Sequence, residues 1–377
     1  MNIGIVCYPT FGGSGVVATE LGKALARQNH KVHFISYQQP ARLDFFSENL
    51  FYHEVMISKY PLFDFPPYET ALTSKLVDVV QFEKLDLLHV HYAIPHASAA
   101  VLAKQILRQK GINIPVITTL HGTDITLVGK DKTFEPVVTY SINESDIVTT
   151  VSQSLKEETY EHFAITKDIA VVPNFIDFER FAKKKKDHFR KAISPFDEPI
   201  IAHTSNFRKV KRVEDVMHIF GKILETRPAK LLMIGDGPER ANAEQLSREL
   251  NTCDHVRFLG KQEAIEEILS VCDLFLLTSE NESFGLAALE AMACEVPVIS
   301  TNAGGIPEVN IQGVTGFLRN VGDVEGMAED ALKLLNDPAM LKQFKHNALK
   351  QARNFDIINI LPQYIDLYNQ ALESIQI

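Results

Sequence analysis

Short apolar runs alternate with longer amphipathic stretches along almost the whole chain. Each run has the length of a buried strand, and the stretches between repeat apolar residues at helical spacing, as in Val16–Gln28, Val213–Thr226 and Ala241–Leu250. The runs that we expect to form strands are Asn2–Cys7, Lys31–Ser36, His53–Ile57, Leu87–His91, Val116–Leu120, Ile147–Val151, Ile200–Thr204, Lys230–Ile234, Val256–Leu259, Leu274–Thr278 and Val298–Thr301. This alternation predicts an α/β protein whose parallel sheets carry helices on both faces.

The chain is too long for one ordinary domain, since 377 residues exceed the usual domain size. The two sets of predicted strands are separated by Val172–Arg180, so we place one domain at residues 1–172 and a second at residues 173–355. The remaining stretch, residues 356–377, repeats apolar side chains at helical spacing and predicts a final helix.

The composition narrows the classes of function. A formal net charge of −10 leaves no basic excess to cover the phosphates of a nucleic acid, so we expect no nucleic-acid partner. The four cysteines show no CxxC spacing and lie in or beside apolar runs, which favours reduced thiols over disulfides or a zinc site. We find no signal-peptide pattern and no apolar run of transmembrane length, and therefore expect a cytoplasmic protein without stable membrane anchoring.

Polar residues and glycines gather where the predicted strands end. The segments concerned are Gly12–Gly15, His89–Tyr92, His121–Asp124, Ser205–Lys211, Gly235–Pro238 and Glu280–Gly285. Parallel sheets bind ligands at the carboxyl ends of their strands, so these segments are the candidate binding site.

The loop after the first strand, Phe11–Ala18, contains the G-x-G-x-x-A pattern that also occurs in dinucleotide-binding proteins. A dehydrogenase needs an acidic residue about 20 positions further on to bind the ribose of its cofactor. Ile35, Ser36 and Tyr37 occupy that place, and the next acidic residue is Asp44, which disfavours a dehydrogenase. No GK[ST] follows to make a P-loop. What remains is a glycine loop whose backbone can approach a phosphate or an acceptor closely.

Two glutamates lie eight positions apart at the junction of a strand and a helix. Glu282 follows the apolar run Asp273–Thr278, and Glu290 lies within Leu286–Cys294, which is rich in helix formers. The first N–H groups of such a helix attract anions, and a nearby carboxylate can accept hydrogen bonds from sugar hydroxyls. The pattern fits a nucleotide-sugar diphosphate, although a solvent-exposed glutamate is the simpler alternative for either residue alone.

Four cations follow the first strand of the second half. The stretch Ser205–Arg212 contains Arg208, Lys209, Lys211 and Arg212 just before a predicted helix. A nucleoside diphosphate that leaves a sugar gains negative charge, which fixed cations and oriented amides stabilise. The alternative is a basic loop that faces solvent, as Lys and Arg usually do.

Histidines near two strand ends raise the question of a metal. His89 and His91 share one face of a strand and His96 follows, but the set lacks the further ligands of a zinc site. We therefore expect no metal and interpret these histidines as the polar lining of a strand end. His121, in the sequence HGTD, could serve as a general base, a sugar ligand or a capped loop residue.

Together these motifs resemble the E-x7-E signature of the retaining glycosyltransferases with the GT-B fold, over nearly the whole chain. The resemblance implies an α/β chain with two Rossmann-like, doubly wound domains and an interdomain cleft, and a last helix that crosses back to the first domain. The other main glycosyltransferase fold holds a metal through a D-x-D sequence, which this chain lacks. We therefore expect transfer without a metal or any other cofactor.

The same resemblance assigns roles to individual residues. The first glutamate of the signature meets the donor sugar and the second meets the ribose, which gives these roles to Glu282 and Glu290. The expected catalytic residues are His121, Glu282, Arg208 and Lys211. The expected donor-binding residues are Gly13, Asn206, Gly235, Leu259, Ser283, Phe284, Gly285 and Glu290. The usual family pattern G-R-x-x-x-x-K-G, aligned on Lys211, puts Asn206 in the arginine position, and Arg208 is our substitute for it.

The resemblance is strongest to one subgroup, the N-acetylglucosaminyl malate synthases of bacillithiol biosynthesis. It rests on the sequences CYPTFGGSGVVATELG, HVHYAIPHA and SNFRKVKR. It implies transfer of N-acetylglucosamine from UDP-N-acetylglucosamine to the hydroxyl of L-malate, with retention of the α configuration. Malate is then expected beside Ser14, Tyr92 and Thr119. Both partners are small-molecule substrates, and a homodimer is left open.

Three alternatives to that reaction stay open. The first is a related transferase with a lipid or saccharide acceptor, which would favour a basic amphipathic face on the first domain. The second is a UDP-sugar epimerase, which would turn over the donor with no acceptor. The third is a sensor that binds a nucleotide sugar without turnover.

Overall fold

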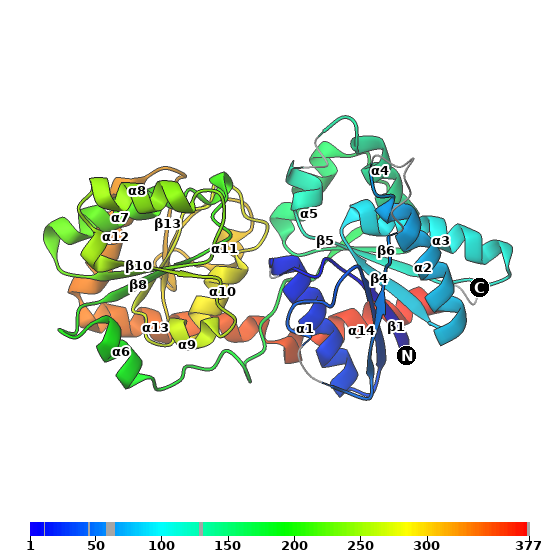
Figure 1. Ribbon diagram of the computed structural model, residues 1–377, viewed down its shortest axis with the longest axis horizontal. Helices are drawn as coiled ribbons and strands as arrows, with labels where there is room; N and C mark the ends of the chain where they lie inside the picture. The colour runs from blue at the N-terminus through cyan, green and yellow to red at the C-terminus, as the bar shows by residue number, and fades with distance from the viewer. Residues whose placement is uncertain (11, 44–45, 58–64, 128–130, 375–377) are drawn as a thin grey trace. The chain divides into compact units, whose positions relative to one another are not determined.

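The computed structural model describes residues 1–377 except 11, 44–45, 58–64, 128–130 and 375–377 (Figure 1). Two compact units make up the chain. The first consists of Met1–Phe175 and Ile357–Ile377, and the second of Ile176–Asp356. Phe11, the first residue of the predicted glycine loop, lies outside the described residues.

The first unit contains a parallel sheet in the order β3-β2-β1-β4-β5-β6-β7. Its strands are β1 Asn2–Val6, β2 Lys31–Ser36, β3 Leu50–Glu54, β4 Leu87–His91, β5 Val116–Leu120, β6 Ile147–Thr150 and β7 Ile169–Val171. Its helices are α1 Gly13–Arg27, α2 Tyr68–Glu83, α3 Ser98–Gln109, α4 Glu135–Glu144, α5 Gln153–His162 and α14 Ile357–Glu373. Short helical turns follow β4 and β5, at Ala93–Ala97 and Thr123–Leu127.

Helices cover both faces of this sheet (Figure 1), and the side chains of β4 alternate between the two faces. Leu88 and Val90 belong to a core cluster that α2 and α3 complete. His89, between them in sequence, points to the opposite face and forms a hydrogen bond with Tyr368 of α14. The last helix of the chain therefore packs within the first unit.

The second unit contains a parallel sheet in the order β10-β9-β8-β11-β12-β13. Its strands are β8 Ile200–Thr204, β9 Lys230–Ile234, β10 Val256–Gly260, β11 Leu274–Leu277, β12 Val298–Thr301 and β13 Gly316–Arg319. Its helices are α6 Asp187–Ile193, α7 Val213–Thr226, α8 Arg240–Glu249, α9 Ile265–Leu269, α10 Leu286–Ala293, α11 Ile306–Val309, α12 Val324–Asn336 and α13 Pro338–Ala352. Phe220 of α7 and Leu276 of β11 lie in its buried core.

The differences from the predicted strands lie at sheet edges. The sequence predicts a strand at His53–Ile57, whereas β3 comprises Leu50–Glu54 and keeps most of its side chains partly exposed. Two other edge strands, Ile169–Val171 and Gly316–Arg319, are absent from the sequence prediction. An edge strand pairs on one side only and is often short, so its sequence carries a weak apolar pattern.

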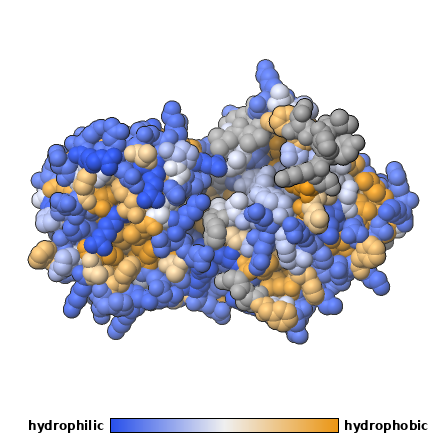
Figure 2. Space-filling view, in the orientation of Figure 1, coloured by the Kyte–Doolittle hydropathy of each residue, from blue (hydrophilic) through white to orange (hydrophobic). Residues whose placement is uncertain are grey.

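Hydrophilic side chains predominate on the face shown in Figure 2, with apolar side chains gathered in smaller areas. Within the described part of the chain, no helix is both long enough and apolar enough to cross a bilayer.

Each sheet reverses its strand order at one place, between β1 and β4 in the first unit and between β8 and β11 in the second. Doubly wound sheets bind ligands outside the carboxyl ends of the strands at this place. The segments that follow these four strands contain Ser14, at the start of α1, and the loop residues Tyr92, Lys211 and Glu282. The topology therefore directs attention to the polar segments that the sequence singles out.

Candidate active site

In the second unit, the basic loop after β8 is fastened to the loop after β11. The hydroxyl of Thr278 donates to the carbonyl oxygens of Lys211 at 2.9 Å and Arg212 at 3.0 Å. The backbone N–H of Glu280 donates to the carbonyl of Val210 at 2.8 Å. Two segments about 70 residues apart in sequence thus form one rigid surface, in keeping with the position of the site at the switch point.

Lys211 and Glu282 form an ion pair on this surface. The Nζ of Lys211 lies 2.6 Å from Oε2 of Glu282, and each side chain is 19% exposed. The hydroxyl of Ser279 donates to the same oxygen at 3.2 Å. The structure therefore brings together Lys211 and Glu282, two of the residues that the sequence predicts to be catalytic. The hydroxyl of Ser279 orients the Glu282 carboxylate.

The turn between Glu282 and α10 depends on two glycines from a later loop. The N–H of Gly305 donates to the carbonyl of Glu282 at 2.9 Å. A Cβ at Gly304 would collide with that same carbonyl, and the positive φ of 56° at Gly304 also favours glycine. Because Gly304 has no side chain, the loop after β12 can pack directly against the loop that contains Glu282.

Helix α10 begins immediately after Ser283, Phe284 and Gly285. Gly285 adopts φ 97°, and Phe284 is buried and packs edge-on against Phe355, with ring centroids 5.5 Å apart. Glu290 lies one turn into the helix and is 8% exposed, so it is not a solvated surface carboxylate. Burial of a carboxylate near a predicted nucleotide site is consistent with the ribose role that the family implies.

The turn after β9 packs under the basic loop. A Cβ at Gly235 would collide with the carbonyl of Ser205, and one at Gly237 with that of Asn206. Phe207 is fully buried at φ 40° and anchors the loop. These contacts explain why glycines occupy the turn, and they leave Asn206 exposed at the surface.

The four cations of this loop are not equivalent. Arg212 is held by Asp215 through two hydrogen bonds of 2.6 and 3.1 Å, which raise the pKa of its guanidinium. Arg208 and Lys209 are exposed, and Lys211 is partly buried against Glu282. Arg208 and Lys209 are therefore open to an anionic ligand, whereas Arg212 is committed to the protein.

Leu259, another donor residue predicted from the sequence, lies near the end of β10, beside the β9 turn. Its carbonyl accepts from the Gln262 side chain at 2.6 Å, and the N–H of Gly235 donates to the carbonyl of Gly260 at 2.8 Å. The backbone near Leu259 therefore lies next to the turn after β9, at the carboxyl ends of the strands of the second sheet.

In the first unit, Ser14 and Tyr92 meet. Their hydroxyl oxygens lie 2.7 Å apart, where α1 begins and β4 ends. Gly15 is required in this turn because a Cβ would lie 2.5 Å from the carbonyl oxygens of Tyr8 and Thr10. Gly13 and Ser14 open α1, whose first N–H groups have no side-chain cap. Two of the residues predicted to bind the acceptor are therefore in direct contact.

His121 is held in place by buried partners. Its Nε2 lies 2.7 Å from Nδ1 of His91, and burial lowers its pKa to about 3, so the imidazole is neutral near pH 7. The Asp124 carboxylate accepts from the N–H groups of Gly122 at 3.0 Å and Ala93 at 2.9 Å. Burial raises the pKa of Asp124 to about 6. These contacts explain the HGTD sequence, in which Asp124 fixes the loop that carries His121.

Thr119 has a different environment from Ser14 and Tyr92. It has no exposed surface, and its hydroxyl lies 2.7 Å from both Nε2 of His89 and Oγ1 of Thr149. Nδ1 of His89 lies 2.7 Å from the hydroxyl of Tyr368 on α14. The hydroxyl of Thr119 thus forms its hydrogen bonds with buried protein groups in this structure, and the side chain stabilises the sheet beneath the site.

His89, His91 and His96 are fully buried and do not form a polar lining. Among the described residues they also do not bring three ligand atoms together for a metal. Sequence reasoning missed the roles of His91 and Asp124, since neither contact is visible in the order of the residues. In the structure β4 pairs with β5 so that His91 lies opposite Thr119, and this pairing brings His91 close to His121. A prediction of that strand pairing would have indicated the contact.

Comparison with known proteins agrees with this geometry. The family model "Glycosyltransferase Family 4" matches residues 11–180, and "Glycosyl transferases group 1" matches residues 184–351. The N-acetyl-alpha-D-glucosaminyl L-malate synthase of Bacillus anthracis is 48% identical, over 99% of this chain and 97% of that protein.

Solved structures share the fold at lower identity. Anabaena HepE in complex with UDP and glucose has a TM-score of 0.83 at 20% identity, covering 98% of this chain and 99% of HepE. The sucrose-phosphate synthase of Thermosynechococcus elongatus has a TM-score of 0.81 at 21% identity, covering 99% of this chain and 100% of that one. The predicted fold class, with two Rossmann-like domains of the GT-B type, is confirmed. The chain therefore belongs to the group 1 and family 4 glycosyltransferases, in the same family as the N-acetyl-alpha-D-glucosaminyl L-malate synthase of Bacillus anthracis.

Proposed function

We propose that this glycosyltransferase transfers N-acetylglucosamine from UDP-N-acetylglucosamine to the hydroxyl of L-malate, the first step of bacillithiol biosynthesis. The geometric observation that carries the proposal is the junction of Lys211 and Glu282 at the switch point of the second sheet. The choice of substrates is supported by the identity of 48% to the Bacillus anthracis synthase over nearly the full length of both chains.

The second unit offers the groups that a nucleotide-sugar donor requires. Glu290 is the proposed ribose ligand, and the N–H groups from Ser283 to Gly285 face the diphosphate at the start of α10. Arg208 and Lys211 stabilise the negative charge that builds on the leaving diphosphate. Glu282 then binds the sugar, so that its ion pair with Lys211 places the sugar and phosphate ligands next to each other.

The first unit offers the groups for the acceptor. The hydroxyls of Ser14 and Tyr92 lie within hydrogen-bond distance of each other and can hold the malate hydroxyl or a carboxylate. The amino end of α1, a helix of 15 residues, supplies N–H groups that suit an anion such as malate. Neutral His121 serves as a hydrogen-bond partner for the donor sugar, since an imidazole with a pKa of about 3 cannot act as a cation near pH 7.

We propose retention of the α configuration through attack on the face from which the diphosphate leaves. A phosphate oxygen of the leaving group takes the proton of the malate hydroxyl, so no protein carboxylate is needed as a covalent nucleophile. We also propose that the transfer needs no metal, because the chain has no D-x-D sequence and already carries fixed cations for the diphosphate.

The test is release of UDP from UDP-N-acetylglucosamine by the full-length protein, with and without L-malate, in the presence of EDTA. We expect release that depends on malate and a product with the summed mass of the two parts, and the anomeric configuration follows from the coupling constant of the product in NMR. Release without malate would contradict the proposal in favour of hydrolysis or an epimerase. Release only after addition of a divalent metal would contradict metal independence, and a β product would contradict retention.

A further inference from the structure

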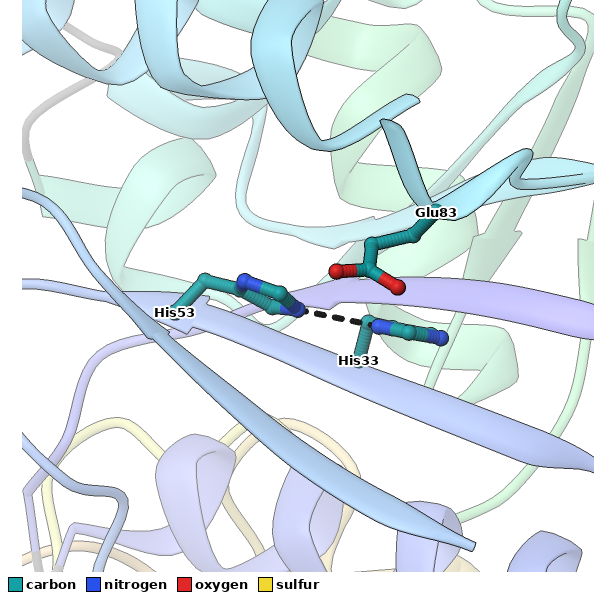
Figure 3. Close-up of side chains that lie close together, drawn as sticks. All are labelled: His33, His53 and Glu83. Atoms are coloured by element: carbon teal, nitrogen blue, oxygen red, sulfur yellow. Dashed lines mark hydrogen bonds between the residues drawn. The ribbon is translucent and has the colours of Figure 1, made fainter. Parts of the chain in front are cut away.

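Three side chains of the first unit converge at a place that the transfer reaction does not use. His33 lies on β2, His53 on the edge strand β3, and Glu83 at the carboxyl end of α2 (Figure 3). One ligand atom from each lies within 4.8 Å of the other two. Nδ1 of His33 and Nε2 of His53 are 2.9 Å apart.

The strand register explains this convergence. β2 and β3 are parallel, with His33 opposite Phe51 and Ile35 opposite His53. The two histidines therefore lie on one face of the sheet, one pleat apart. Ile35 on that face packs in the same core cluster as α2, which places Glu83 over the two imidazoles. The ring of Phe51 stacks on His33 with centroids 4.6 Å apart and shields its other side.

The charges at this place suit a cation. A histidine ring without its second proton offers one nitrogen lone pair to a metal, and His33 and His53 each bring a ring nitrogen to this place. The Glu83 carboxylate faces them, and among the described residues no hydrogen bond joins it to either ring. A carboxylate and two neutral imidazoles make up a ligand set that zinc commonly uses.

We propose that His33, His53 and Glu83 form a binding site for a divalent metal ion, with zinc as the ion that this ligand set fits best. Ligand atoms bound tetrahedrally to zinc lie about 3.3 Å apart, given bonds of about 2.0 to 2.1 Å. The observed 2.9 Å between the two nitrogens and the 4.8 Å limit on the set bracket that separation. Glu83 is exposed and His53 is partly exposed, so an ion and a water ligand can reach the site.

The proposed metal would have a structural role. It would hold β3, the first strand in the order of the described sheet, to β2 and to the end of α2. His33 lies near the middle of β2, whereas Ser14, Tyr92 and His121 follow the carboxyl ends of their strands. The proposal is therefore compatible with a transfer reaction that proceeds in EDTA.

One feature of His33 limits the strength of the site. Metal binding through Nδ1 places the ring proton on Nε2, which is buried and has no hydrogen-bond partner in the described part of the chain. Histidine ligands of tight zinc sites usually have such a partner. We therefore expect a single zinc ion bound more weakly than in a structural site with four protein ligands.

The experiment is a zinc titration of the full-length protein, first stripped of metal, in competition with a chromophoric chelator. We expect one zinc per chain and a rise in the temperature of unfolding when zinc is added. His53→Gln and Glu83→Gln change side chains that are not fully buried, and each should weaken binding about tenfold or more. Circular dichroism of each variant without metal establishes that it is folded.

Two control variants separate this site from adventitious binding. Cys253→Ser removes an exposed thiol that could capture zinc, and His346→Gln removes an exposed histidine. We expect both controls to bind zinc as the unaltered chain does. Equal zinc affinity in folded His53→Gln, in Glu83→Gln and in the unaltered chain would overturn the proposal, and so would loss of binding in Cys253→Ser. The cobalt-loaded protein adds an independent readout, because a thiolate-to-cobalt charge-transfer band would overturn a site built from two histidines and a glutamate.

Discussion

The ammonium nitrogen of Lys211 lies 2.6 Å from a carboxylate oxygen of Glu282, although the two residues are 71 positions apart. Each comes from the loop after one of the two strands that flank the switch point of the second sheet. The proposed reaction uses the cation for the leaving diphosphate and the carboxylate for the sugar. Their contact places both ligands at the bond that breaks, so each residue should matter for the rate of the chemical step.

Glu282→Gln and Lys211→Gln should each lower kcat by about 10²- to 10³-fold, since fixed charges at a site of developing charge commonly contribute that much. UDP release in the presence of L-malate measures the effect. Lys209→Gln is the matched control, because Lys209 is an exposed cation of the same loop and takes no part in the ion pair. Its rate should stay within about threefold of the unaltered enzyme, as exposed charges have weak effects. Equal losses in all three variants would instead indicate a diffuse effect of the loop's charge.

Gly304 supports Glu282 through close backbone approach, which leads to a prediction about stability and donor binding. Gly304→Ala introduces a Cβ that collides with the carbonyl of Glu282, at φ 56°. We expect a loss of about 2 kcal/mol or more in the free energy of unfolding and a higher KM for UDP-N-acetylglucosamine.

Gly313→Ala is the control for Gly304→Ala. Gly313 has a similar φ of 70°, but a Cβ there has no neighbour within 4 Å, so only backbone strain of about 1 kcal/mol is expected. Urea unfolding measures both variants. The proposed support would be contradicted if the two alanine variants lost equal stability and kept the same KM for the donor.

Buried neutral histidines predict how stability depends on pH. Burial lowers the pKa to about 3 for His89 and His121, to about 4 for His96 and His203, and well below the ordinary value for His91. As the pH falls, these side chains become protonated near pH 6.5 in the unfolded chain and only at lower pH in the folded chain. Stability should therefore fall as the pH drops from about 6.5 toward 4, by about 1.4 kcal/mol per pH unit for each histidine.

Asp124 acts in the opposite direction, because burial raises its pKa to about 6 and the folded chain then holds the extra proton. It offsets one histidine between about pH 6 and 4. Urea unfolding at several pH values measures the slope. His203→Gln should reduce that slope by one proton. A flat profile from pH 6.5 to 4 would contradict the neutral state of these buried histidines.

The sequence predicts the central strands of both sheets well because apolar residues predominate in them, as in Leu274–Leu277. It fails at β3, β7 and β13, where an edge strand needs less apolar surface. The spacing of Glu282 and Glu290 points to the correct strand, turn and helix, since these residues are neighbours along the chain.

Contacts between distant segments are what the sequence could not supply. His91 and His121 are 30 positions apart, and their contact follows from the pairing of β4 with β5. The family resemblance places Thr119 beside the acceptor, but the hydroxyl of Thr119 is turned inward to His89 and Thr149. Successive residues of a strand point to opposite faces of the sheet, so the face on which Thr119 lies determines the partners of its hydroxyl. A short run with two adjacent threonines does not show which of them points to which face.

The contact between Ser14 and Tyr92 predicts how the acceptor is bound. Ser14→Ala and Tyr92→Phe should each raise the KM for L-malate about five- to thirtyfold, since each removes a hydroxyl worth about 1 to 2 kcal/mol to a bound polar group. The KM for UDP-N-acetylglucosamine should change little, because neither hydroxyl is among the proposed ligands of the donor. Because the two hydroxyls are 2.7 Å apart, removing one also disturbs the other. The double variant should therefore lose less than the product of the two single losses, in a double-mutant cycle measured on kcat/KM for malate. Fully multiplicative losses would show that the hydroxyls act independently, and an equal rise in the KM for the donor would remove both residues from the acceptor site.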